Sequence, residues 1–209
     1  MRFERHARED LVSRLSARVD DVRVLQAMAS VPRDRFVPSK LRDRAWENTS
    51  LPIGRGQTIS QPAVVARMCE LLELTGTEIV LDVGTGSGYH AAVLARLARH
   101  VVSIERHRPL SCEAGLKLRA AGVRNVELVV GDGTLGHPPA APYDAISVAA
   151  SSRAGVPIAL QEQLAPHGRL VMPSDDGGGE RLVRLRRVDG EFTYERLDPV
   201  RFVPLVSDD

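Results

Sequence analysis

The residues best suited to chemistry form one short motif, in which an acidic residue precedes three glycines at alternate positions. The motif comprises Asp82, Gly84, Gly86 and Gly88, and it follows the aliphatic run at residues 79–81. Apolar residues then recur at helical spacing. A strand that turns through glycines into a helix lets the backbone approach a ligand, and the helix N-terminus offers unpaired N–H groups. The motif therefore predicts a ligand-binding turn.

Three other glycine motifs do not fit this turn. A dinucleotide-binding turn needs Gly-x-Gly-x-x-Gly, but position 89 is Tyr89, and no Gly-Lys-Ser/Thr follows as in a phosphate-binding loop. A hydrolase elbow needs serine where this chain has Gly86. The pattern acidic-x-Gly-x-Gly-x-Gly resembles the first motif of S-adenosylmethionine-dependent methyltransferases, whose cofactor carries an ammonium and a sulfonium. A dinucleotide site and a plain strand–turn–helix stay open as alternatives.

Two further acids stand where predicted strands end. Glu105 ends the predicted strand at 100–105, where a carboxylate can accept two hydrogen bonds from a ribose diol. Asp132 lies between two glycines after the next predicted strand, at 126–130. It can accept a hydrogen bond from an adenine amino group, or it can simply form an Asp-Gly turn.

Residues 45–61 are predicted to form a long loop, because two glycines, a proline and several hydroxyl residues interrupt any regular pattern. Apolar side chains within it indicate that the loop packs onto the domain, and long packed loops are often functional. Ser60 or Gln61 can cap the helix that begins near Pro62. From residue types alone, capping is the simplest role for Ser60.

The elements that must position these residues follow a recognisable order. Two helices are predicted before residue 32, and their arginines are expected to form a solvated face. Alternating strands and helices then predict a parallel sheet, and Asp189-Gly190 predicts a hairpin between the last two strands. The fold class is α/β: a Rossmann-like, mostly parallel, doubly wound sheet of the class I methyltransferase type, ending in an antiparallel hairpin, with an N-terminal helical extension.

Length and composition favour one soluble enzyme domain. The 209 residues are read as a single methyltransferase domain, with 1–61 as the helical extension and substrate loop and 62–209 as the cofactor-binding core and hairpin. The net charge of +1 gives no support to nucleic-acid or anionic-membrane binding. Cys69 and Cys112 are far apart, which suggests a reduced, cytoplasmic protein, and no Cys/His spacing indicates a metal site. A monomer is expected.

Beyond the glycine turn, most of the chain resembles one family, the protein-L-isoaspartate O-methyltransferases. The Gly-Gln-Thr-Ile-Ser segment is much more specific than the glycine motif, which other methyltransferases share. The matching segments run in order from about residue 20 to residue 206. They are 31–33, 35–38, 51–54, 56–62, 82–89, 103–105, 131–133 and 201–205.

The resemblance implies a reaction and a set of site residues. The family moves a methyl group from S-adenosyl-L-methionine to the α-carboxylate of an L-isoaspartyl residue in a damaged protein, leaving S-adenosyl-L-homocysteine. The methyl ester then closes to a succinimide. Ser60 falls on the active-site serine, and Val206 lies about where the family's C-terminal tail closes over the cofactor. The implied cofactor-binding residues are Gln57, Thr58, Ile59, Ser60, Asp82, Gly84, Gly86, Gly88, Glu105, Asp132, Gly133 and Val206.

This reaction does not require acid–base catalysis by the protein. A carboxylate with a pKa of about 4 is already an anionic nucleophile at pH 7, so no general base is needed. The protein must desolvate the carboxylate and align it, and such positioning can be worth about 7 kcal/mol or more. The Ser60 hydroxyl and nearby backbone N–H groups are candidate holders of the carboxylate. Ser60 would orient the substrate rather than attack it.

Departures from the family pattern cluster where substrate is expected. Residues 45–48 read Ala-Trp-Glu-Asn instead of Ala-Tyr-x-Asp, and the segment after the fourth predicted strand is one residue longer than usual. Ala149 and Ala150 end that strand and leave room beside the cofactor. Arg55 and Arg153 lie in the two variable loops, so one of them is predicted to border the substrate cleft.

Three alternative functions remain. A related carboxyl O-methyltransferase would act on aspartate of a specific peptide or on another acceptor. A non-catalytic binding module would keep the fold without the reaction. A nicotinamide-dependent oxidoreductase would use the glycine turn for a dinucleotide. Methyl transfer to isoaspartyl and aspartyl peptides separates the first alternative from the leading hypothesis, and cofactor-binding measurements separate the other two.

Overall fold

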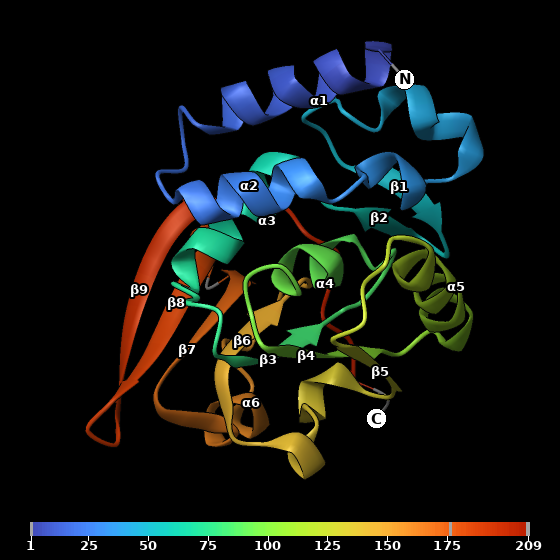
Figure 1. Cartoon of the computed structure of the whole chain (residues 1–209). Coiled ribbons are helices and arrows are strands. Elements are labelled where there is room, and N and C mark those ends of the chain that lie inside the picture. The colour runs from blue at the N-terminus through green and yellow to red at the C-terminus, as the bar shows by residue number, and fades with distance from the viewer. Residues whose placement is uncertain (1, 176, 208–209) are drawn as a thin grey trace.

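The computed structural model describes residues 2–175 and 177–207, with side chains from residue 6 onward. Its centre is a seven-stranded sheet with the order β5-β4-β3-β6-β7-β8-β9 (Figure 1). The strands are β3 (Ile79–Val83), β4 (His100–Glu105), β5 (Val126–Val130), β6 (Tyr143–Val148), β7 (Leu164–Asp175), β8 (Glu180–Val188) and β9 (Glu191–Pro199).

The sheet topology creates a switch point beside β3. The chain enters the middle of the sheet at β3, moves outward through β4 and β5, and then crosses back to β6 on the other side of β3. All pairs from β5 to β7 are parallel, whereas β7–β8 and β8–β9 are antiparallel. Ligands of open α/β sheets bind where strand order reverses, outside the carboxyl ends of the strands. The predicted fold class is confirmed.

Helices cover both faces of the sheet. Figure 1 shows α1 and α2 above the sheet and α6 below it, with α1 outermost. The helices are α1 (Arg2–Leu15), α2 (Val22–Ser30), α3 (Pro62–Leu71), α4 (Tyr89–Leu94), α5 (Arg108–Ala120) and α6 (Ile158–Glu162). Short 3-10 helices are η1 (Arg33–Arg35), η2 (Ser39–Arg44), η3 (Gly133–Leu135) and η4 (Pro138–Ala140). Within the described residues, no helix combines the length and apolar character that a bilayer crossing requires.

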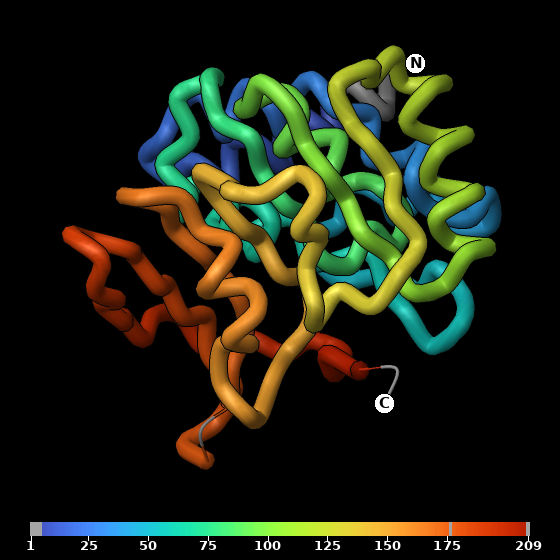
Figure 2. Tube along the Cα trace, turned by 90° about the horizontal axis from the view of Figure 1, so that it is seen from below, coloured from blue at the N-terminus to red at the C-terminus, as the bar shows by residue number. Residues whose placement is uncertain are grey.

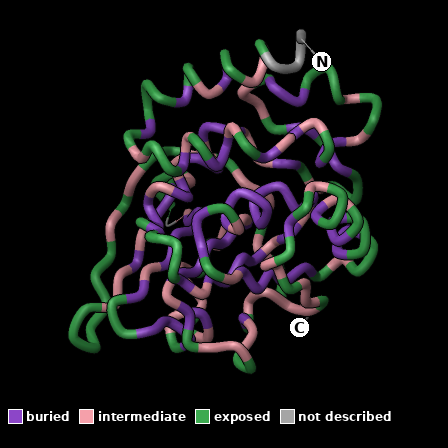
Figure 3. Tube along the Cα trace, viewed as in Figure 1, coloured by how far each residue is buried: buried purple, intermediate pink, exposed green. Residues whose placement is uncertain are grey.

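Two apolar clusters form the core, one on each face of the sheet. Because successive strand residues point to opposite faces, Val80 packs with the N-terminal helices, whereas Leu81 and Val83 pack in the cluster that contains Leu160 of α6. Figure 3 shows the buried residues concentrated in the central strands, while β9 is largely exposed. Asp82 shares the face of Val80 and therefore lies beneath helices.

The prediction that residues 45–61 form an irregular loop needs correction, because this segment contains a two-stranded antiparallel hairpin. Strands β1 (Leu51–Gly54) and β2 (Gln57–Ile59) pair across a turn in which Arg55 and Gly56 have φ values of 53° and 70°. Pro and Gly signals suggested irregular backbone. The alternation of buried Leu51 and Ile53 with exposed neighbours is nevertheless a strand pattern.

Other boundaries shift by a few residues. The alternation of strands and helices predicts a short strand at 168–173 after a helix at 156–164; the strand extends over Leu164–Asp175, and the helix covers only Ile158–Glu162. The pairing of β6 with β7 contains a register shift, which accommodates the left-handed His167 (φ 62°) inside the longer strand. The predicted turn at Asp189-Gly190 is confirmed, since both residues have positive φ as a two-residue hairpin requires.

Candidate active site

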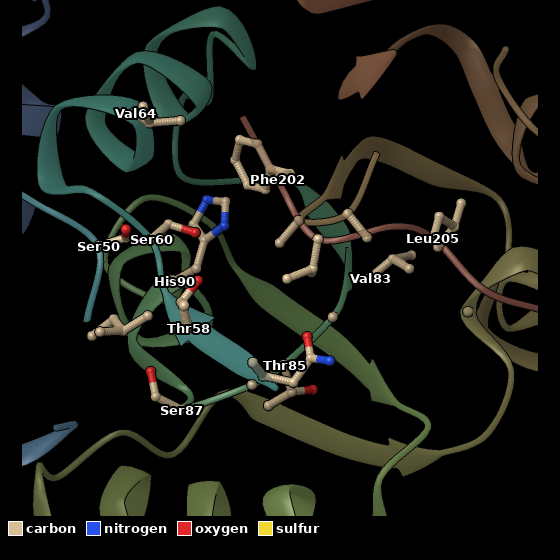
Figure 4. Close-up of a pocket in the computed structure, with 18 of the residues that line it drawn as sticks. Ser50, Thr58, Ser60, Val64, Val83, Thr85, Ser87, His90, Phe202 and Leu205 are labelled. Atoms are coloured by element: carbon tan, nitrogen blue, oxygen red, sulfur yellow. The ribbon is translucent and has the colours of Figure 1, made fainter. Parts of the chain in front are cut away.

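A cleft of about 650 Å³ opens at the carboxyl ends of β3, β4 and β6, which is the switch point of the sheet. Figure 4 shows its walls: Ser60 and Val64 from one side, Val83 from the sheet, and Phe202 and Leu205 from the C-terminal segment. Segments distant in sequence therefore meet around one cavity.

The glycine turn forms the floor of this cleft. Gly84, Gly86 and Gly88 have φ values of 95°, 51° and 86°, in the region that side chains strongly disfavour. Gly84 and Gly86 line the cleft. Gly88 does not, and a Cβ there would lie 3.1 Å from the Cβ of Ala114 in α5. The third glycine thus permits helix packing, whereas the first two expose backbone to a ligand.

Glu105 lies at the end of β4, as predicted, and lines the cleft although it is only 6% exposed. Its Oε2 accepts a hydrogen bond from the Gly86 N–H at 2.8 Å, and its Oε1 accepts one from the His107 N–H at 2.9 Å. A carboxylate has about four acceptor positions. Glu105 therefore fixes the glycine turn and keeps the capacity to accept from a ligand hydroxyl.

Asp132 and Gly133 differ in their relation to the cleft. Gly133 lines it, and a Cβ at this position would lie 2.4 Å from Cγ1 of Val83, so only glycine fits. Asp132 does not line the cleft. Its Oδ1 accepts from the backbone N–H and the hydroxyl of Thr134, at 2.8 and 2.7 Å, which caps η3. The cofactor role of Asp132 stays a prediction.

Asp82 lies behind the cleft instead of lining it. Its side chain is fully buried, and Ser103 Oγ donates to Asp82 Oδ2 at 2.7 Å. Thr85 Oγ1 lies 2.6 Å from Ser103 Oγ and extends this polar cluster. Burial raises the pKa of Asp82 to about 7, and the negative charge of Glu105 adds to the rise. A cofactor interaction of Asp82 must therefore act from beneath the glycine turn.

His90, which sequence reasoning missed, does line the cleft and is 8% exposed. Its Nδ1 lies 3.7 Å from Asp82 Oδ1, and its Nε2 lies 3.6 Å from Cys69 Sγ. Burial lowers the pKa of His90 to about 4, so the imidazole is neutral at pH 7. The sequence signal that could have identified His90 is its position in the first turn of the helix that follows the glycines, where a side chain can lie next to a bound ligand.

Ser60 lines the cleft on the side opposite the sheet, and Figure 4 shows its hydroxyl beside the ring of His90. Among the described residues, no donor or acceptor forms a hydrogen bond with that hydroxyl. Of the two predicted caps, Gln61 occupies the N-cap position but makes no side-chain bond there, and Ser60 does not cap; Asn48 Oδ1 accepts from the Ala63 N–H at 3.0 Å instead. The Ser60 hydroxyl is available to a ligand.

Arg33 holds the Ser60 segment in place and was also missed, because the N-terminal arginines were expected to be solvated. Its side chain is buried, and its guanidinium donates to the carbonyls of Ala45, Thr49 and Ser60; the last two bonds measure 3.0 Å. It also lies over the Tyr89 ring, 5.7 Å from the centroid. Burial lowers the pKa of Arg33 to about 10, which still leaves it charged at pH 7.

The remaining predicted residues fall into two groups. Gln57, Thr58, Ile59, Ala149, Ala150 and Val206 line the cleft. Arg55 and Arg153 do not line it: both are exposed, and Arg55 lies in the β1–β2 turn. A substrate role for either arginine stays a prediction. Among the described residues, no group of three or more His, Cys, Asp or Glu side chains is arranged to hold a metal ion.

The C-terminal strap, residues 199–206, forms one wall of the cleft. In Figure 2 it leaves the β8–β9 hairpin, in red, and runs across the molecule toward the C terminus. Glu180 Oε1 accepts from the Phe202 N–H at 2.6 Å. Ser151 donates its N–H to the Val203 carbonyl at 2.8 Å and accepts from the Leu205 N–H at 2.7 Å. These bonds hold the strap over the sheet edge.

Comparison with known proteins agrees with this geometry. The family model described as protein-L-isoaspartate(D-aspartate) O-methyltransferase matches residues 6–209. The chain belongs to the protein-L-isoaspartate O-methyltransferase family. Similar members include protein-L-isoaspartate O-methyltransferase 1 of Rhodopseudomonas palustris, 51% identical over 97% of this chain and 84% of the relative. Another, from Roseiflexus castenholzii, is 50% identical over 98% of this chain and 92% of the relative.

Solved structures extend the likeness to the fold. A protein-L-isoaspartate O-methyltransferase structure superposes with a TM-score of 0.86 at 27% identity, covering 96% of this chain and 66% of that longer one. A Plasmodium falciparum protein of the same family name, solved with S-adenosyl-L-homocysteine, has a TM-score of 0.83 at 24% identity, with 96% and 99% covered. The family fold thus includes the N-terminal helices as well as the sheet.

Proposed function

We propose that this chain transfers the methyl group of S-adenosyl-L-methionine to the α-carboxylate of L-isoaspartyl residues in damaged proteins and peptides. The product ester closes to a succinimide, which reopens partly to aspartate. One observation carries the proposal: Ser60 lines the same cleft as the glycine turn, and its hydroxyl has no hydrogen-bond partner among the described residues. Membership of the family, and the activity in the names of similar proteins, support it.

The cleft fits an adenosyl cofactor by size and chemistry. Its volume of about 650 Å³ lies within the usual range of about 300–1,000 Å³ for small-molecule sites. Gly84 and Gly86 expose backbone, Glu105 can accept from ribose hydroxyls, and Gly133 keeps the wall beside Val83 clear. When bound there, the cofactor supplies an electrophilic methyl group on a positively charged sulfur.

The protein's part in the reaction is to hold the acceptor. Isoaspartyl α-carboxylates are ionised at pH 7, so their oxygen can attack the methyl carbon directly as the carbon–sulfur bond breaks. No proton is transferred, and the neutral His90 is not required as a base. The Ser60 hydroxyl would donate to the carboxylate, and apolar Val64 and Phe202 beside it would exclude water.

Methyl transfer to matched peptides tests the proposal. The purified chain would receive S-adenosylmethionine labelled in its methyl group and either of two peptides that differ only in isoaspartate against aspartate at one position. We expect labelled, base-labile ester on the isoaspartyl peptide alone. Faster labelling of the aspartyl peptide would instead assign the enzyme to carboxyl methylation of ordinary aspartate. Labelling of neither would remove the proposed reaction.

We also propose that residues 1–209 act as one methyltransferase domain, as a monomer in the cytoplasm, on protein substrates and not on nucleic acid. The near-neutral net charge of +1 supports the last point. Cys69 and Cys112 are both free thiols, which is consistent with a reducing compartment. Sedimentation equilibrium at micromolar concentration tests the monomer, and a dimer mass would contradict it.

A further inference from the structure

A row of buried polar side chains crosses the sheet beneath α4. Asp82 on β3 is in register with Ser103 on β4 and Ser147 on β6, and all three are fully buried. The Ser103 hydroxyl donates a hydrogen bond to Asp82 Oδ2, but Asp82 Oδ1 has no hydrogen-bond partner among the described residues. Leaving a buried charged acceptor unpaired is costly, so the surroundings of Oδ1 need an explanation.

One side chain of the covering helices faces this oxygen, and a second lies behind it. His90 of α4 brings Nδ1 to 3.7 Å from Oδ1, slightly longer than a hydrogen bond. Behind the ring, Cys69 of α3 lies with Sγ 3.6 Å from Nε2. Cys69 is completely buried, and burial together with the charge of Asp82 raises the pKa of its thiol, which stays protonated.

The contacts on the two ring nitrogens favour one tautomer of the neutral imidazole, although the Cys69 sulfur could donate to Nε2 or accept from it. With the proton on Nε2, the lone pair of Nδ1 would face the carboxylate, whereas with the proton on Nδ1 the Sγ–H can donate to Nε2. The favoured ring proton is therefore on Nδ1, directed at Asp82 Oδ1. A movement of a few tenths of an ångström closes the Nδ1–Oδ1 distance to hydrogen-bond length. Cys69, His90 and Asp82 thus form a chain of donors that ends on a carboxylate.

His90 connects this chain to the cleft. It lines the cleft beside Ser60 (Figure 4), whereas Asp82 is not among the residues that line the cleft. Other titratable groups near Asp82 do not supply a cation: Glu105 of β4 is acidic and Cys69 is neutral. The buried hydroxyl of Ser147 also has no hydrogen-bond partner among the described residues, but of the two side chains only His90 lines the cleft, so its neutral N–H is the donor that can link Asp82 to a ligand.

We propose that His90 is a positioning residue for the methyl-donor site. Held by Cys69, it donates Nδ1–H to Asp82 Oδ1 and keeps that carboxylate ionised beneath the cleft when a cationic ligand binds above it. The inference rests on the proposed cofactor site. An ionised carboxylate in a low-dielectric interior favours a nearby cation strongly, so the effect of His90 is felt in cofactor affinity rather than in proton transfer.

Calorimetric binding of S-adenosylmethionine without peptide, from pH 5.5 to 8.5, tests the proposal. Affinity in the parent should rise with pH as Asp82 ionises. In His90→Leu, which has no donor, the midpoint should move about one pH unit higher and affinity at pH 7 should fall about fivefold, because the ionised fraction of Asp82 at pH 7 falls from about one half to about one tenth. In His90→Asn, whose amide N–H takes the place of Nδ1–H, both should stay near the parent. Asp82→Asn should remove the pH dependence.

The outcomes separate this inference from the proposed function. If the parent does not bind the cofactor, the proposed site fails. If the parent binds but His90→Leu matches it in affinity and midpoint, the positioning role is wrong. An equal loss in His90→Asn and His90→Leu would show that only the packing of the ring matters. Persistence of the pH dependence in Asp82→Asn would show that another group titrates.

Nitrogen NMR of the unliganded parent gives a second test that does not depend on the variants folding. The chemical shifts of the His90 ring nitrogens report the tautomer directly, and we expect the proton on Nδ1. Cys69→Ser, which keeps a donor, should preserve that tautomer, while Cys69→Ala should allow both. A parent spectrum with the proton on Nε2 would overturn the proposed chain of donors.

Discussion

Ser60 and Asp82 lie at different depths, and this difference separates what their substitution should do. Ser60 presents to the cleft a hydroxyl that no described residue bonds, while Asp82 is buried under the glycine turn and bonded to Ser103. The first can contact an acceptor carboxylate directly. The second can influence a ligand only through its charge and through the residues between them.

Ser60→Ala should therefore reduce turnover more than cofactor binding. A hydrogen bond to a charged group contributes about 1.5–3 kcal/mol, so we expect kcat/KM for an isoaspartyl peptide to fall about 10–100-fold. The dissociation constant for S-adenosylhomocysteine, measured by calorimetry, should change by less than about twofold. Ser13→Ala, at an exposed position on α1, is the control. Unchanged kcat/KM in Ser60→Ala would exclude this serine from substrate positioning.

Asp82→Asn should change how stability depends on pH. The folded-state pKa of Asp82 is raised from 3.8 to about 7, so the protonated form stabilises the fold below about pH 4. That contribution is lost as pH rises through about 7. The amide of asparagine does not ionise. We expect the stability of Asp82→Asn relative to the parent to increase by about 2–4 kcal/mol between pH 4 and pH 8.

Urea unfolding of the unliganded proteins across this pH range measures the difference. Asp43→Asn, at an exposed position, is the control for the same change of side chain at the surface. A pH-independent difference between Asp82→Asn and the parent would contradict the raised pKa of Asp82.

Among the elements, those defined by local patterns could be predicted and those defined by distant contacts could not. The strand before Asp82, the glycine turn and the Asp189-Gly190 hairpin are encoded by adjacent residues, and each was found. By contrast, Arg33 bonds carbonyls up to 27 residues away, and although it lies in a segment that matches the family, no local hydrophobic pattern marks it as buried. Its burial is a property of the assembled segment.

The same reasoning explains Asn48 and His90. Asn48 bonds the first turn of α3 from 15 residues upstream, so the capping side chain was sought at the adjacent Ser60 and Gln61, of which only Gln61 occupies the N-cap position. His90 belongs to the site because Cys69, 21 residues earlier, and Asp82 lie on its two sides. Helical spacing predicts that a residue faces inward, but it does not identify the groups that the residue meets.

The segment carrying Ser60 should loosen when Arg33 is replaced. Arg33→Met keeps much of the side-chain volume but leaves the carbonyls of Ala45, Thr49 and Ser60 without this donor. Unsatisfied buried groups cost about 1–3 kcal/mol each, so we expect a loss of about 3 kcal/mol or more in the free energy of unfolding. kcat/KM should fall as well.

Arg35→Met is a matched control two residues away. Arg35 is exposed and donates to the Ala120 carbonyl at 3.2 Å, so its loss should cost less than about 1 kcal/mol. Urea unfolding compares the two variants. Equal destabilisation would contradict the special role of Arg33.

In the molecule as a whole, the cleft depends on three distant parts of the chain. The β1–β2 hairpin and the start of α3 form one wall, the switch point of the sheet forms the floor, and the C-terminal strap forms the other wall. The two apolar clusters on the sheet faces contain few strap residues. The domain should therefore fold without the strap, although its cleft would then lack one wall.

Ending the chain after Val200 should leave a folded protein with an open cleft. Removal of the strap from Arg201 onward deletes one wall, and we expect cofactor affinity to fall at least about tenfold while far-ultraviolet circular dichroism stays unchanged. A chain that ends after Ser207 is the control and should bind as the parent does. Full affinity in the shorter chain would show that the strap is not part of the site.

The pairing of the strap with the segment at Ser151 has a consequence for protein engineering. Ser151 bonds to both Val203 and Leu205, so the two segments share one register. A single-residue insertion in either segment would reverse which strap side chains face inward, because extended chains alternate with a period of two. Chimaeras between relatives whose loops differ in length at 149–155 should therefore exchange that loop and residues 199–206 together as one cassette.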